Sequence, residues 1–181
     1  TSKEFLRNLE LNDFQNVILE NFAISNIDNH EILFNESLND WESSQTHNDF
    51  KNYSTTKVNT LKIDTLVKKI DLSKYTPILK LDIEGNEINA IKGATNFIEI
   101  TSPLIIMEIS KFVFDNKENI DYLKNFLHNF NYSIYNIDKK KQNIEEILIK
   151  LKKLNKKHKT IGNYYLIRNS SKILKEFISY E

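Results

Sequence analysis

The chain has 181 residues, of which 40% are hydrophobic and 28% are charged, and this balance is ordinary for a globular protein. Its 25 basic and 25 acidic residues cancel, which argues against a surface dedicated to nucleic acid or anionic lipid, since both need a basic excess. The chain has no cysteine, which excludes disulfides and thiolate zinc sites, and no apolar run reaches the roughly 18 residues that span a bilayer.

The first third of the chain predicts short elements around a long polar segment. The expected elements are a helix and three strands, at residues 3–11, 16–21, 31–34 and 55–63. Ser2 can cap the first helix. Residues 35–53 are polar and have no hydrophobic period, and a loop of this length in a domain is usually functional. Its Trp41 either covers part of the core or stacks on a sugar ring.

From Pro77 onward, strands and helices alternate regularly. The expected strands are 78–83, 103–109, 132–137 and 163–167. The expected helices are 88–98, 119–130, 144–154 and 171–178, and a short helix at 64–70 precedes Pro77. Strands that alternate with helices of this length indicate crossover connections on a mostly parallel sheet, so we predict an α/β fold. We expect residues 1–181 to belong to one domain.

One strand carries charges that a buried strand normally lacks. Lys80, Asp82 and Glu84 occupy alternate positions in ILKLDIEGNE, so they are predicted to share one face. The next strand is apolar until Glu108 appears near its end. Strands of a parallel sheet are covered on both faces, and ligands bind beyond their carboxyl ends. We therefore expect Asp82, Glu84 and Glu108 to crowd one crevice.

Such a cluster has a chemical and a structural interpretation. Close carboxylates repel, so the pKa of at least one should rise unless a cation, such as Lys80 or a metal, lies among them. A carboxylate of this kind can accept a proton from a substrate hydroxyl as a general base. In the structural alternative, Lys80 and Asp82 form an ordinary ion pair, and Glu87 lies on the surface in the first turn of the next helix.

The order of these residues resembles the FkbM-type methyltransferases. The segments VNTLKIDTLV, ILKLDIEGNEINAIKGA and SPLIIMEIS follow the order of that family's motifs. The matching positions are Lys80, Asp82, Glu84, Gly85, Glu87, Gly93, Ala94, Pro103 and Glu108. The resemblance covers most of residues 1–110 and is looser beyond them.

The resemblance implies a Rossmann-like class I methyltransferase that uses S-adenosyl-L-methionine and methylates a hydroxyl of a sugar, glycan or small metabolite. It places Asp82 and Glu84 between cofactor and acceptor, one of them as the base, with Glu108 nearby and Lys80 keeping a carboxylate ionised. Ala23 and Ile24 are expected to lie against the adenine. We expect no nucleic-acid partner and no membrane span, the oligomeric state stays open, and we expect a cytoplasmic protein.

The chain also departs from the family pattern. The strand, glycine-rich turn and helix that begin the family's cofactor site, and the following strand with its ribose-binding acid, have no counterpart in these 181 residues. The resemblance therefore implies the carboxyl-terminal part of a methyltransferase domain without its first β-α-β unit, which alone should bind cofactor poorly. Two alternatives remain. Asp82, Glu84 and Glu108 could hold magnesium for phosphoryl transfer, or the chain could be a non-catalytic interaction module.

Overall fold

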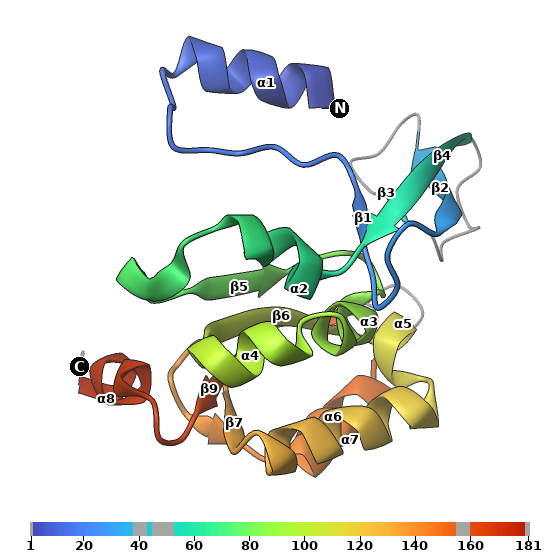
Figure 1. The fold of residues 1–181 in the computed structure, drawn as a ribbon. Coiled ribbons are helices and arrows are strands. Elements are labelled where there is room, and N and C mark those ends of the chain that lie inside the picture. Colours follow the sequence, from blue (N-terminus) through green and yellow to red (C-terminus); the bar gives the residue numbers. More distant parts are fainter. Residues whose placement is uncertain (1, 38–42, 45–52, 155–159, 180–181) are drawn as a thin grey trace.

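The computed structural model describes residues 2–37, 43–44, 53–154 and 160–179, and Figure 1 shows their arrangement. The strands are β1 (Ala23–Ile24), β2 (Glu31–Ser37), β3 (Ser43–Ser44), β4 (Tyr53–Leu61), β5 (Ile78–Leu81), β6 (Leu104–Ser110), β7 (Tyr132–Tyr135), β8 (Lys141–Gln142) and β9 (Thr160–Arg168). The α-helices are α1 (Ser2–Leu11), α2 (Ile63–Leu66), α3 (Glu87–Lys92), α4 (Thr95–Thr101), α5 (Lys111–Phe114), α6 (Lys117–Asn129), α7 (Ile144–Lys152) and α8 (Lys172–Ser179). Two 3-10 turns, Val67–Lys69 and Leu72–Lys74, precede β5.

The strands of the described residues form two mixed sheets. The first has the order β1-β4-β2-β3, and the second has the order β5-β6-β9-β7-β8. The pairs β1–β4 and β5–β6 are parallel, whereas β2 pairs antiparallel with β4, and β9 runs antiparallel to both β6 and β7. The chain is α/β, but the expectation of a mostly parallel sheet is wrong, because β9 inserts in the opposite direction between β6 and β7.

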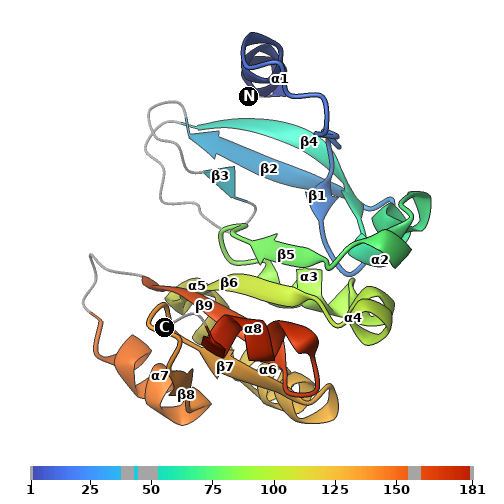
Figure 2. The same cartoon turned by 90° about the vertical axis from the view of Figure 1, so that its left-hand side faces the viewer.

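The core lies on one face of the second sheet. Alternate residues of β6, namely Ile105, Met107 and Ile109, are fully buried and join one apolar cluster with side chains of α3, α4, α6 and α7. On the opposite face, α8 packs on β7 and β9, with the Phe177 ring 5.7 Å from that of Tyr135 (Figure 2). The helices therefore cover one face of this sheet throughout and the other face only around β7 and β9.

The charged strand β5 is an edge strand with one open face. Ile78, on the same face as Lys80, keeps 63% of its surface exposed, whereas Leu81 on the core face is 3% exposed. The expectation of a strand covered on both faces is therefore wrong. Charged side chains on the solvated face of an edge strand remain in contact with water. The charges of β5 are therefore less unusual than they would be on a buried strand.

The region before β1 differs from the prediction. The helix at 3–11 is confirmed as α1, but none of its residues, all of which the structure describes, is buried. Residues 16–21 do not form the predicted strand, and Ile18 is 79% exposed. The strand begins only at Ala23, where β4 offers hydrogen-bonding partners. An apolar run becomes a strand only where a neighbouring strand takes its backbone hydrogen bonds.

Asp64 has a different role from the predicted one. As the first residue of the expected helix 64–70 it could cap that helix, but α2 begins at Ile63 and has no side-chain cap. Its carboxylate instead accepts hydrogen bonds from the backbone nitrogens of Asn96 (3.1 Å) and Phe97 (2.8 Å) in the first turn of α4. The residue before α4 is Ala94, which has no capping side chain, so Asp64 caps this helix from another element.

Within the part of the chain that the structure describes, no helix combines the length and apolarity needed to cross a membrane.

Candidate active site

The candidate site lies where the parallel strands β5 and β6 end. Lys80 pairs with Ile106, and Leu81 with Met107. Asp82 follows Leu81 at the end of β5, and Glu108 follows Met107 inside β6, so the register places the two residues at the same level of adjacent strands. The alternation of each strand places Asp82 on the open face that carries Lys80. The sheet register thus places two of the three predicted acidic residues at one level.

Lys80 and Asp82 form a direct ion pair. The Lys80 Nζ atom donates a hydrogen bond of 2.6 Å to Oδ2 of Asp82, and the two side chains are 53% and 47% exposed. An ion pair so accessible to water stabilises a fold by about 0–1 kcal/mol. This contact is the ion pair that the structural alternative expects. It also places a cation next to the carboxylate that the resemblance assigns to the site, so it is compatible with both interpretations.

Glu84 does not share the strand face of Lys80 and Asp82. Strand β5 ends at Leu81, and the chain turns through Glu84 (φ 52°) and Gly85 (φ 105°) before α3 begins. A left-handed φ is easy for glycine but unusual for glutamate, so the turn must be held by other contacts. The alternation that predicted one face for all three charges fails at this turn.

The turn is held by Glu87, whose role the sequence interpretation missed. Its side chain is 1% exposed, and its carboxylate accepts hydrogen bonds from the backbone nitrogens of Ile83 (3.1 Å) and Gly85 (3.1 Å). Burial raises the pKa of Glu87, these hydrogen bonds oppose the rise, and the nearby charge of Glu108 adds to it. The expectation that Glu87 lies on the surface is wrong.

The end of β1, in the first sheet, contacts the turn after β5. Asn86 donates a 2.6 Å hydrogen bond from Nδ2 to the carbonyl oxygen of Ile24. At the other end of α3, a Cβ atom at Gly93 would overlap the carbonyl oxygen of Ser25 and lie 3.1 Å from its carbonyl carbon. Because glycine has no Cβ, the end of β1 can rest directly on α3. The predicted cofactor segment, Ala23 and Ile24, therefore lies beside the connection that follows Asp82.

A comparison with protein families matches residues 3–134 to the family described as the methyltransferase FkbM domain. The match covers more than half of the 181 residues. The chain belongs to this FkbM methyltransferase family. Neither a search of curated proteins nor a search of solved structures found a match. The resemblance drawn from the residues of β5, its turn and β6 is confirmed, and the family makes the chain a methyltransferase.

The residues at the end of β1 fit one side of a methyltransferase cofactor. Ala23 and Ile24 are half buried, so they present some apolar surface, which suits the flat, apolar faces of an adenine ring. They are fixed to the turn after β5 by the Asn86 hydrogen bond. That Ala23 and Ile24 contact the cofactor stays a prediction.

A metal centre finds no support in the geometry. Among the residues for which the structure gives positions, no group of three or more histidine, cysteine, aspartate or glutamate side chains lies close enough to hold a metal ion. Asp82, Glu84 and Glu108 are therefore not gathered into a group of this kind.

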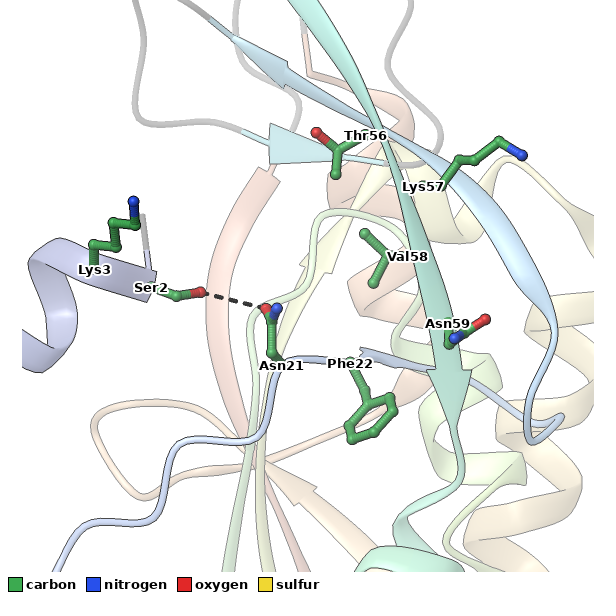
Figure 3. A pocket seen from close by; sticks show the side chains of 8 residues that line it. All are labelled: Ser2, Lys3, Asn21, Phe22, Thr56, Lys57, Val58 and Asn59. Carbon is green, nitrogen blue, oxygen red and sulfur yellow. Dashed lines mark hydrogen bonds between the residues drawn. The ribbon is translucent and has the colours of Figure 1, made fainter.

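A surface hollow of about 550 Å³ lies near β1 (Figure 3). Its wall comes from the start of α1, from residues 21–22 and from residues 56–59 of β4. Ser2 donates a 3.3 Å hydrogen bond to Asn21 across one side, and Lys57 at another is paired with Glu31 at 2.6 Å. Its lining is mostly exposed, and it contains none of the predicted site residues. Trp41, which the sequence analysis considered as a residue that stacks on a sugar ring, lies outside the described residues.

Proposed function

We propose that this FkbM domain catalyses transfer of a methyl group from S-adenosyl-L-methionine to a hydroxyl oxygen of a sugar, glycan or small metabolite. The observation that carries the proposal is the register of the parallel strands β5 and β6, which places Asp82, just after β5, level with Glu108 of β6 in a chain of a methyltransferase family. Carboxyl ends of parallel strands are where open α/β sheets bind their ligands.

The chemistry needs a group that takes up one proton. When bound, S-adenosyl-L-methionine supplies an activated methyl group. As a carbon–oxygen bond forms on the acceptor, its hydroxyl proton must leave, and a carboxylate at hydrogen-bonding distance is suited to accept it. Asp82 is the first candidate for this base because its side chain is 47% exposed and so can be reached by an acceptor.

The neighbouring groups have supporting roles in this proposal. Lys80 Nζ donates to Oδ2 of Asp82 and so limits the directions in which the carboxylate can point. Glu84 and Glu108 remain alternative bases, because each lies next to Asp82 along the turn or across the sheet. Holding the acceptor oxygen in line with the methyl group of the donor, beside such a carboxylate, supplies a large part of the rate enhancement.

The experiment measures formation of S-adenosylhomocysteine by the full-length protein from S-adenosyl-L-methionine and a panel of methyl glycosides. We expect product formation that depends on a glycoside with a free hydroxyl, and S-adenosylhomocysteine binding by isothermal titration without added magnesium. Binding of magnesium ions with no binding of S-adenosylhomocysteine would overturn the proposal and favour phosphoryl chemistry. Binding of neither would favour an interaction module.

A further inference from the structure

Glu87 is a buried carboxylate that the proposed reaction does not use directly. It is 1% exposed at the start of α3, and the next residue, Ile88, is part of the core at 2% exposure. Burying a carboxylate costs free energy unless hydrogen bonds satisfy it. Those hydrogen bonds come from the backbone of the turn after β5.

The two hydrogen bonds enclose Glu84. Ile83 and Gly85 are its direct neighbours, and both direct their N–H groups to the Glu87 carboxylate, at 3.1 Å from Oε1 and 3.1 Å from Oε2 respectively. Between them Glu84 has a φ of 52°, a conformation that non-glycine residues adopt only when their surroundings impose it. Glu87 is thus placed to impose that conformation.

We propose that Glu87 is a positioning residue, which holds the turn 83–85 so that Asp82 and Glu84 present their carboxylates at the carboxyl edge of the sheet. This inference rests on the proposed methyl transfer for its functional consequence. The structural part of the inference, that one carboxylate fixes the backbone on both sides of Glu84, does not depend on the proposed methyl transfer.

The role requires a group that only accepts hydrogen bonds. An ionised carboxylate offers two acceptor oxygens, whereas a glutamine amide offers one oxygen and one NH₂ donor. In a Glu87→Gln protein, one of the two oxygens becomes an NH₂ donor. With the remaining oxygen at the Oε1 position, the Gly85 N–H would lose its 3.1 Å bond and keep only the longer 3.4 Å one, and with the oxygen at the Oε2 position the Ile83 N–H would face the donor. The variant keeps the size and shape of the side chain, so the core around Ile88 should not be disturbed.

The first measurement is amide hydrogen exchange in the full-length protein. In Glu87→Gln we expect the amides of Ile83 and Gly85 to exchange about tenfold faster or more, while that of Met107 is unchanged. Glu99→Gln, which makes the same change at an exposed position of α4, is the matched control and should alter neither amide. Unchanged exchange at Ile83 and Gly85 in Glu87→Gln would overturn the proposal.

The second measurement separates positioning from a purely structural role. With S-adenosyl-L-methionine and the active methyl glycoside, we expect kcat of Glu87→Gln to fall about tenfold or more, with KM for the cofactor changed less than about threefold. A lowered melting temperature with unchanged kcat would show a purely structural role. If the unmodified protein transfers no methyl group to any glycoside, the proposed function fails, and the exchange experiment alone decides the role of Glu87.

Discussion

The side-chain amide of Asn86 donates a 2.6 Å hydrogen bond to the carbonyl oxygen of Ile24, which joins two residues 62 positions apart. Asn86 lies in the turn between β5 and α3, and Ile24 is the last residue of β1. This bond connects the segment proposed to contact the cofactor with the segment proposed to contact the acceptor. A site that handles both molecules needs such a connection, because the methyl donor and the acceptor must be held in line.

Replacing Asn86 by alanine should therefore weaken cofactor binding. The carbonyl oxygen of Ile24 would lose its partner, which costs about 1 kcal/mol, and β1 would be held less firmly against the turn. We expect the dissociation constant of S-adenosylhomocysteine to rise roughly fivefold in isothermal titration. Asn96→Ala, at an exposed position of α4, is the control and should bind as the unmodified protein does. If the two variants bind S-adenosylhomocysteine with equal affinity, the Asn86 hydrogen bond does not contribute to cofactor binding.

Gly93 should not tolerate a methyl group. Its φ of −78° is available to any residue, so the obstacle is the backbone of Ser25, which a Cβ atom would overlap, and that of Asn26, whose Cα would lie 3.3 Å away. Gly93→Ala must push β1 away from α3, and overpacking of this kind costs about 1–3 kcal/mol. Urea denaturation should show this loss in the free energy of unfolding. A variant as stable as the unmodified protein would show that β1 does not rest on α3 in solution.

Asp64 should contribute to stability as the cap of α4. Asp64→Ala removes the acceptor for the amides of Asn96 and Phe97, and loss of such a cap costs about 1 kcal/mol. Thermal unfolding should show a lower melting temperature than for Asp121→Ala, in which an exposed aspartate of α6 is removed. Identical melting temperatures for the two variants would contradict the capping role.

The pH dependence of stability should reveal the buried Glu87 carboxyl. Burial raises its pKa above the ordinary 4.5, with a further contribution from Glu108 on β6, the facing acidic group. The folded protein therefore binds this proton more tightly than the unfolded chain does. That contribution to stability is complete below about pH 4.5 and is lost as the pH rises through the folded pKa.

The measurement compares the free energy of unfolding of the unmodified protein with that of Glu87→Gln from about pH 4 to about pH 7. Because glutamine cannot ionise, the advantage of the unmodified protein over the variant should shrink as the pH rises. An advantage that grows with pH would mean that the hydrogen bonds from the turn outweigh burial and lower the pKa.

Local patterns predicted most of the helices and strands after Pro77. The apolar run around Met107 forms β6, and the segment with helical periodicity before Phe130 forms α6. Both succeed because the apolar residues of each segment pack into the core, as their spacing predicts. The predicted strand at 16–21 did not form, since pairing depends on a neighbour that its own residues do not specify. The edge position of β5 and the antiparallel insertion of β9 are likewise properties of the whole sheet.

The candidate site was predictable in part for the same reason. Asp82 and Glu108 follow apolar runs, so the place of Asp82 after β5 and of Glu108 toward the end of β6 could be expected from the sequence. The burial of Glu87 could not, because an acid in the first turn of a helix normally faces water. The available signal was its position two residues after Gly85, directly before the apolar Ile88, which leaves it between a tight turn and the core.

The most direct test of the account is the Asp82→Asn protein, assayed for both methyl transfer and cofactor binding. Asparagine keeps the shape of the side chain but cannot serve as a base, so turnover with the active methyl glycoside should fall at least about tenfold. The dissociation constant of S-adenosylhomocysteine should stay within about threefold of the unmodified value, since Ala23 and Ile24 are untouched. Unchanged turnover would remove Asp82 from the mechanism and leave its bond to Lys80 as an ordinary surface ion pair.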